Sequence, residues 1–381
     1  MPIQWTPTLD AILREVVDRE GGTWTEIARA VTLQVGFRVT PDMARNRYAR
    51  LEQSDDVLEM LPETDTVESL RAALKDARAQ LNAARAVRPE LQSAYEQAVA
   101  KAISGMHIPP VMPPQVEPAG EERAVMLGAD WQMGKLIRGH YDSQTAMARV
   151  ASWFDQSIEL IVQRDVREVH LLLLGDLVEN ETIFPKQPHL IDSSLYRQVF
   201  DVAEALANGI RKLLAAVPDV YVEGLGGNHG YNQKTSHPET NFDCMAMNTA
   251  RLILESETRL TFPEPITPGE EHWYIRHEVG EHVFFGMHGN QVRSQPYSKA
   301  MRDKLNGYYA TLGGFDFAVT GHYHQALMAD IGRFIHFAAG STESGNTYAQ
   351  QWLATGAQMG SQWTLFLDDD GLTSHHMIRL P

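Results

Sequence analysis

Cysteine is nearly absent from this sequence, since Cys244 is the only one among 381 residues. A single cysteine excludes an internal disulfide and fits a reducing compartment, so we expect a cytoplasmic protein. Long apolar runs are missing too, because none approaches the roughly 18 residues that a membrane span needs. The opening MPIQWTPTLD lacks the basic start and apolar core of a secretory signal. We therefore expect a soluble protein with no membrane partner.

Basic residues are outnumbered, with 33 Lys and Arg against 49 Asp and Glu, which gives a formal net charge of −16. This balance argues against a protein that coats nucleic acid by bulk electrostatics, because neutralising phosphates needs clustered Lys and Arg. A local site that binds nucleic acid is not excluded. Residues 1–51 carry 7 basic and 6 acidic residues, whereas residues 121–381 carry 20 and 32. The N-terminal part is therefore the least acidic.

Residues 1–52 have the pattern of a three-helix module. Apolar residues share a helical face in LDAILREVV and again in EIARAV, and TPDMARNRYARL opens with a threonine cap and a proline at the first helical position. Trp5, Trp24 and Tyr48 recur as aromatic anchors. This arrangement resembles the Myb/SANT helix-turn-helix family, with Tyr48 in place of the usual tryptophan.

In that family the third helix reads the DNA major groove, which would here be residues 41–51. The resemblance implies DNA as a partner and four contacting side chains, Arg45, Asn46, Arg47 and Arg50. Two alternatives stay open, because related modules bind proteins and because arginines on a helix usually form a solvated face.

Residues 63–106 are rich in helix-forming residues, and their apolar positions alternate between spacings of three and four, which is typical of a heptad seam. This helical connector either joins two copies as a coiled coil, giving a homodimer, or packs on its own chain. Pro89 predicts a kink or the first turn of a second helix. Residues 107–120, which contain IPPVMPPQVEPAG, are expected to form an extended linker.

Residues 121–381 alternate apolar strand-like segments with helical ones, which predicts an α/β domain. The expected strands are RAVMLGAD, EVHLLLLGD, DVYVEGLGG, HVFFGMHG, FDFAVTGH, RFIHFAAGS and QWTLFLDDDG. The expected helices lie near residues 142–164, 194–217, 240–257 and 297–312.

Polar residues that can bind metals follow five of these strands at the point where each strand ends. In chain order they are Asp130 and Gln132, Asp176 and Glu179, Asn228 and His229, His288, and finally His322 and His324. Open α/β sheets place their sites at this end of the strands. One such residue would more often be a turn or a structural histidine, but turns alone hardly explain the ordered series. The mix of carboxylate, amide and imidazole suits cations such as manganese, iron or zinc.

The series resembles the calcineurin-like metallophosphoesterase superfamily, whose pattern runs Asp-x-His, Gly-Asp-x-x-Asp/Glu, Gly-Asn-His-Asp/Glu, His and Gly-His-x-His. The resemblance covers residues 123 to about 368 and implies a β-sandwich flanked by helices. It also implies two divalent metal ions, manganese first, with iron, zinc, magnesium or nickel as alternatives. Asp176 would bridge both ions. Asp130, Gln132 and His324 would complete one site, and Asn228, His288 and His322 the other.

His229 would be the catalytic residue beside the phosphate, where it would protonate the leaving oxygen or stabilise the transition state. Two positions depart from the family pattern. Gln132 stands where a histidine ligand is usual, and its amide oxygen is a weaker donor. Gly230 stands where an acid usually orients the catalytic imidazole, so we expect the tautomer and pKa of His229 to be less constrained.

ADWQMGKL is similar to the Asp-Trp-His-Leu-Gly opening of double-strand-break-repair nuclease subunits. Together with the N-terminal module, this favours a metal-dependent DNA nuclease held on DNA by that module, and it leaves open an ATPase partner. A small-substrate phosphodiesterase or phosphoprotein phosphatase with a regulatory N-terminal module is the second hypothesis. A non-catalytic DNA-binding or assembly factor is the third.

Overall fold

The computed structural model describes residues 5, 7–20, 23–35, 39–59, 101, 108–184, 186–231, 240–263, 266, 272–345 and 359–381. The chain divides into two compact units, Met1–Ala84 and Arg85–Pro381. The predicted helical connector at 63–106 falls, apart from Lys101, outside the described residues. Among the described helices, none combines the length and the apolar character that crossing a bilayer requires.

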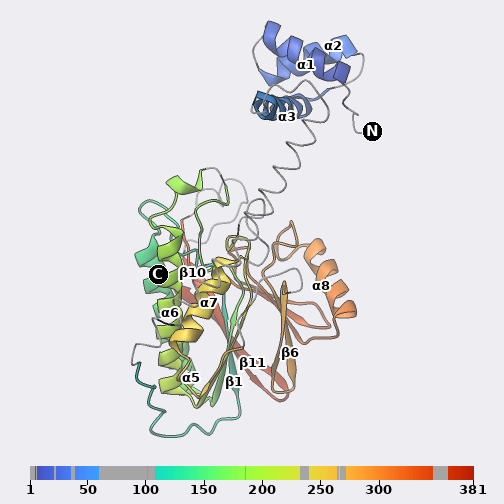
Figure 1. Ribbon diagram of the computed structural model, residues 1–381. Helices are drawn as coiled ribbons and strands as arrows, with labels where there is room; N and C mark the ends of the chain where they lie inside the picture. Colours follow the sequence, from blue (N-terminus) through green and yellow to red (C-terminus); the bar gives the residue numbers. More distant parts are fainter. Residues whose placement is uncertain are drawn as a thin grey trace, which may run out of the picture. The chain divides into compact units, whose positions relative to one another are not determined.

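The described part of the first unit contains three helices, α1 (Pro7–Glu20), α2 (Trp24–Val35) and α3 (Pro41–Glu59) (Figure 1). Thr23 begins α2 with a reciprocal cap, because its backbone N–H donates to Glu26 Oε2 at 2.9 Å while its hydroxyl accepts from Glu26 N at 3.4 Å. Trp24 and Tyr48 pack with ring centroids 5.8 Å apart. The small core is completed by Leu13, Val16, Ile27, Ala28, Val31, Val39 and Ala44.

The second unit is built on two mixed β-sheets. The first has the order β11-β10-β1-β2-β3-β4, and the second β5-β6-β7-β9-β8. The bounds are β1 (Arg123–Gly128), β2 (Glu168–Leu173), β3 (Asp219–Gly224), β4 (Leu260–Thr261), β5 (Tyr274–Val279), β6 (His282–Met287), β7 (Phe317–Thr320), β8 (Leu327–Asp330), β9 (Ile335–Ala338), β10 (Gly360–Asp368) and β11 (Gly371–Leu380). Strands β1 to β4 run parallel, as do β6, β7 and β9.

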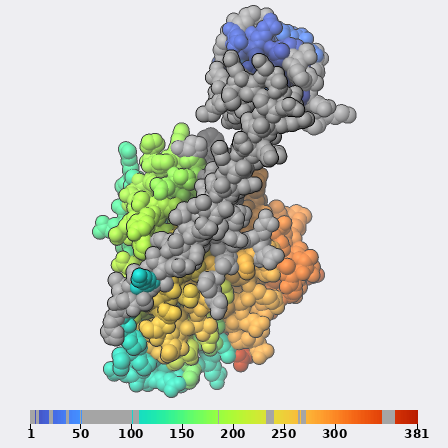
Figure 2. Space-filling model, viewed as in Figure 1, coloured from blue at the N-terminus to red at the C-terminus, as the bar shows by residue number. Residues whose placement is uncertain are grey.

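Helices cover the outer faces of both sheets, so the second unit is a four-layer sandwich (Figure 1). The first sheet carries α5 (Ser143–Gln163), α6 (Leu195–Ala216) and α7 (Phe242–Ile253), and the second carries α8 (Lys299–Thr311); a short 3-10 helix spans Gln187–His189. In the space-filling view, residues of α6 (green), α7 (yellow) and α8 (orange) form much of the visible surface (Figure 2). The expected β-sandwich flanked by helices is confirmed.

Alternation along β1 shows why its sequence is apolar at almost every position. Ala124 and Met126 pack among the helices, whereas Val125 and Leu127 pack between the two sheets. Because successive side chains point to opposite faces, a strand buried on both faces reads as a continuous apolar run. All seven expected strands are present, and the four expected helices begin with side-chain caps from Asp142, Ser194, Asn241 and Ser298.

The Pro-rich residues 108–120 form no helix or strand, and part of the segment is bonded to the second unit. Val111 N donates to Glu257 Oε1 at 2.9 Å, and Arg211 Nη2 donates to Pro109 O at 3.0 Å. Near its end, Gly120 N donates to Asp165 O at 2.9 Å. At these points the extended segment is held by hydrogen bonds.

Candidate metal centre

The loops that follow β1 and β2 continue the pairing of the two strands. Asp130 N donates to Gly175 O and Gln132 N donates to Asp176 O, both at 3.0 Å. Because the carboxyl ends of parallel strands meet at one edge of a sheet, these bonds bring the first two predicted ligand motifs side by side.

Most of the predicted ligands adopt a backbone conformation that non-glycine residues rarely use. Among the described residues, seven other than glycine have a positive φ, and five of them are predicted ligands: Asp130, Gln132, Asp176, His322 and His324, with φ between 43° and 73°. This conformation costs roughly 1–3 kcal/mol per residue and clusters at functional sites. The strain is therefore concentrated where the sequence predicts a site.

Four predicted ligands form what we call the Asp176 group: Asp176, Asn228, His288 and His322. Candidate ligand atoms of Asp176, His288 and His322 all lie within 4.8 Å of one another. His288 Nε2 is 3.1 Å from both Asp176 Oδ2 and Asn228 Oδ1. His288 Nδ1 lies 2.7 Å from Leu174 O, and since a carbonyl only accepts, Nδ1 carries the proton. The Nε2 lone pair of the neutral ring therefore points at this group.

The electrostatics of this group are those of a site built for positive charge. Burial alone would lower the pKa of His288, but Asp176 raises it to about 9. Burial would raise the pKa of Asp176, yet the charges of His288 and His229 hold it far below its ordinary value. His322 has its pKa lowered to about 3 by burial and by His288, so it stays neutral. A proton on His288 occupies the place that a cation could take.

The remaining predicted ligands, Asp130, Gln132 and His324, form the Asp130 group. Asp130 is fully buried, its Oδ2 accepts from His322 N at 2.7 Å, and its Oδ1 has no hydrogen-bond partner among the described residues. That free oxygen is 3.4 Å from His324 Nε2, which in turn is 3.2 Å from Gln132 Nε2. The bond from His322 N joins this group to the Asp176 group.

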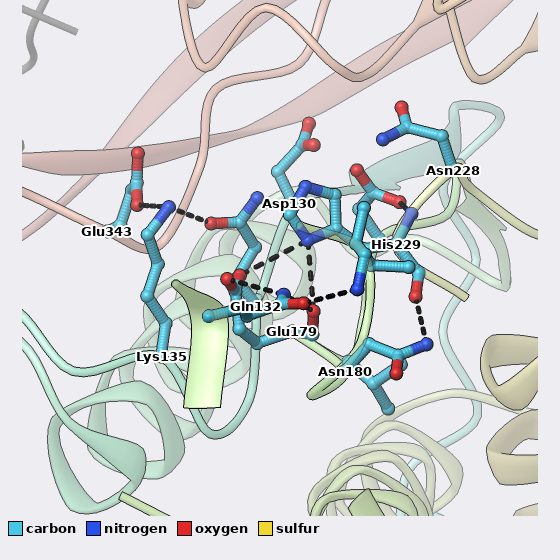
Figure 3. A network of polar contacts seen from close by, with 12 residues as sticks. Asp130, Gln132, Lys135, Glu179, Asn180, Asn228, His229 and Glu343 are labelled. Atoms are coloured by element: carbon cyan, nitrogen blue, oxygen red, sulfur yellow. Dashed lines mark hydrogen bonds and ion pairs between the residues drawn. The ribbon is translucent and has the colours of Figure 1, made fainter. Parts of the chain in front are cut away.

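Lys135 and Glu343 complete this side of the site, and the sequence analysis missed both. Lys135 Nζ donates to Gln132 Oε1 and pairs with Glu343 Oε2 (Figure 3). The other Glu343 oxygen accepts from His324 Nδ1. The side chains of Lys135 and Glu343 are 15% and 4% exposed, so the pair is desolvated. Burial would raise the pKa of Glu343, but Lys135 and His324 hold it well below its usual range.

His229 is held in place although glycine follows it. Its Nδ1 is 3.0 Å from Glu179 O and 3.3 Å from Glu179 Oε2, and its backbone N donates to Asp176 Oδ1 at 2.6 Å. Burial would lower the pKa of His229, but Glu179 and Asp176 raise it to about 9. The tautomer and the pKa of His229 are therefore constrained by Glu179, although glycine follows the histidine. A Cβ at Gly230 would lie 2.2 Å from Asn241 Oδ1, so a larger residue there would have to displace the side chain that caps α7.

Asp243, at the start of α7, ties two of the ligand-bearing loops together. One carboxylate oxygen accepts from Asp176 N at 2.9 Å and from Gly227 N at 2.8 Å, and the other accepts from the N–H groups of Leu177 and Val178. Burial and the nearby Asp176 raise the pKa of Asp243 to about 6. The sequence gives no signal for this residue beyond a carboxylate near a helix start.

The residues present fit divalent cations. Imidazole nitrogens with their other nitrogen bonded, buried carboxylates and an amide oxygen are the donor set of borderline metals. Asp130 Oδ1 is buried and has no hydrogen bond to any described residue, which is costly unless something positive faces it. Gly227 makes room for the arrangement, because a Cβ there would lie 2.1 Å from Asp176 Oδ1.

The structure pairs two of the four predicted DNA-contacting side chains with carboxylates. Arg47 donates from Nε and Nη2 to both oxygens of Asp10, at 2.7 and 2.6 Å, and lies 5.9 Å from the Trp5 ring. Arg45 pairs with Asp42 one turn away at 2.6 Å, and Asn46 is exposed. The side chain of Arg50 lies outside the described residues. Arg47 thus holds α3 to α1 in the first unit.

No family model and no curated protein matches this chain. Among solved structures it is similar to vacuolar protein sorting 29 from Cryptosporidium parvum, with 15% identity and a TM-score of 0.35 over 68% of this chain and 97% of that one. It is also similar to an archaeal phosphodiesterase at 11% identity, with a TM-score of 0.32 over 68% and 99% of the two chains. A third similar structure is a predicted phosphoesterase from Streptococcus pneumoniae, at 11% identity and with a TM-score of 0.30 over 68% of this chain and 99% of that one. TM-scores below 0.5 support no conclusion about this chain.

Proposed function

We propose that this protein is a metal-dependent phosphodiester hydrolase and that its substrate is DNA. The observation that carries the proposal is the convergence of Asp130, Asp176, Asn228, His288 and the His322/His324 pair on one edge of the sheets, with the strained backbones and buried carboxylates described above. When bound there, divalent ions supply charge neutralisation for the phosphoryl oxygens and acidify a water.

His229 acts as the general acid of this proposal. Glu179 O fixes the proton of Nδ1, so Nε2 is the nitrogen that exchanges a proton with substrate. With its pKa raised to about 9, the ring is protonated at neutral pH and can donate to the leaving oxygen. Asp176 accepts the backbone N–H of His229 and thereby keeps the acid at a fixed place relative to the Asp176 group.

The choice of DNA as substrate rests on the three-helix unit at the N-terminus, since a module that binds the polymer raises the effective concentration of the hydrolytic site. The pairing of Arg47 with Asp10 reduces the number of free cations on that unit. Residues 121–381 also carry 20 basic against 32 acidic residues. These two observations favour a second candidate, a phosphodiesterase or phosphatase for small or protein substrates.

A cleavage assay separates the two candidates. The full-length protein is incubated with manganese and either linear single- and double-stranded DNA or bis(p-nitrophenyl) phosphate, with Asp176→Asn as the control. We expect the wild-type protein to cleave DNA and the Asp176→Asn variant to leave it uncut. Hydrolysis of the small ester with intact DNA would favour the second candidate. An Asp176→Asn protein as active as the wild type would remove the proposed role of the site.

A further inference from the structure

Gln132 does not present its amide oxygen as a free ligand. Its Oε1 accepts from Lys135 Nζ, so the amide N–H₂ is the end that faces His324 Nε2, at 3.2 Å. An amide nitrogen carries no lone pair for a metal ion. The Asp130 group is therefore left with two direct ligands of its own, Asp130 and His324.

Lys135 adds a fixed positive charge beside these two ligands (Figure 3). Its ammonium group is held by Gln132 on one side and by the buried carboxylate of Glu343 on the other, and Glu343 in turn fixes the imidazole of His324. A lysine with a side chain only 15% exposed has few other positions to take. In such a desolvated place, charges repel or attract more strongly than they do in water.

The two groups consequently differ in what they offer to a dication. The Asp176 group has a carboxylate, two imidazoles and an amide oxygen with no ammonium bonded to any of them among the described residues. The Asp130 group has two direct ligands of its own instead of four, and an ammonium ion lies one side chain away. Both differences weaken the binding of a dication at the Asp130 group, because one removes a ligand and the other adds electrostatic repulsion.

We propose that Lys135 is a built-in cation of the Asp130 group, which makes the metal centre asymmetric: one divalent ion binds tightly at the Asp176 group, and a second binds weakly beside Lys135. Glu343 is a positioning residue in this arrangement, because it holds both Lys135 and His324. The inference rests on the proposed function in that both require divalent ions at this site.

Isothermal titration of the full-length, chelator-treated protein with manganese tests the inference without any activity measurement. We expect one tight event and a second with a Kd at least about 10-fold higher. In Lys135→Met, which removes the charge and keeps a similar length, the Kd of the weak event should fall by about 10-fold or more. Lys135→Arg keeps the charge and should bind as the wild type does.

Lys135→Gln provides a second neutral variant should Lys135→Met fail to fold, which thermal unfolding of the metal-free proteins reveals. Two wild-type events of equal affinity, or neutral variants that bind like Lys135→Arg, would overturn the inference. If the two affinities are equal and the protein still cleaves DNA, the proposed function stands and only the asymmetry of the metal centre is wrong. A wild-type protein that binds no divalent ion at all would remove both the inference and the proposed function.

Discussion

At the scale of single residues, the structure shows how His229 is held although glycine follows it. Glu179 lies one motif earlier in the sequence, yet it provides both the carbonyl that accepts from Nδ1 and a carboxylate oxygen at 3.3 Å. The imidazole is thus held by a contact from a loop other than its own. Burial would lower the pKa of His229, but Glu179 and Asp176 raise it to about 9.

Replacing His229 tests its proposed role as the general acid. His229→Ala should bind manganese with unchanged stoichiometry, because the imidazole is not among the atoms that form the Asp176 group. Its turnover should fall about 10²–10⁴-fold, the usual contribution of a general acid. Metal content and initial rates are measured on the same preparation. His272→Ala, at an exposed histidine, is the matched control, and equal rates for the two variants would contradict the assignment.

At the scale of elements, the site depends on loops that are held together by α7. Asp243 at its start accepts four backbone N–H groups from the loops after β2 and β3. In Asp243→Asn, part of this acceptor becomes an N–H₂ group that faces unpaired donors. We expect a loss of about 2–4 kcal/mol in the free energy of unfolding and weaker metal binding.

Urea unfolding and calorimetry check both effects. Asp303→Asn is the control, since that carboxylate is 60% exposed on α8 and its loss should change stability by less than about 0.5 kcal/mol. An Asp243→Asn protein with wild-type stability and metal affinity would show that the two loops keep their positions without this residue.

The sequence predicted the elements that are buried on both faces and missed those at the edges. Strands β1, β2 and β7 read as apolar runs because sheets or helices cover both of their faces. Strands β5 and β11 lie at sheet edges and mix buried with exposed side chains, and exposed polar residues such as Arg276, His375 and Arg379 concealed them.

The candidate ligands were predictable for a related reason. Each follows a strand of clear apolar pattern, and the glycines beside them mark the sharp turns. Lys135, Glu343 and Asp243 were not, because what matters about them is a partner in another segment. Lys135 and Glu343 pair with each other, and Asp243 accepts from the Gly227 backbone. Pairwise contacts of this kind leave no local pattern in a single sequence.

At the scale of the whole molecule, the sandwich buries neutral histidines that should set its acid stability. His336 in β9 is 1% exposed and lies 3.0 Å from Thr320 Oγ1, and burial lowers its pKa to about 4. Between pH 6.5 and about 4, the unfolded chain binds a proton at this position that the folded chain does not. Stability should therefore fall as the pH drops through this range.

Urea unfolding at several pH values measures this contribution. His336→Gln should flatten the wild-type decline by up to about 1.4 kcal/mol per pH unit, the value for one proton. The exposed His272→Gln serves as the reference and should leave the slope unchanged. Parallel curves for wild type and His336→Gln would mean that His336 is already charged in the folded protein.

The central claim is that residues at the ends of five strands hold divalent ions around Asp176. Anomalous scattering from crystals grown with manganese tests it most directly. We predict a strong peak at coordination distance, about 2.0–2.3 Å, from Asp176, Asn228, His288 and His322, and a weaker one between Asp130 and His324. Crystals with no anomalous peak within reach of Asp176 would contradict the account.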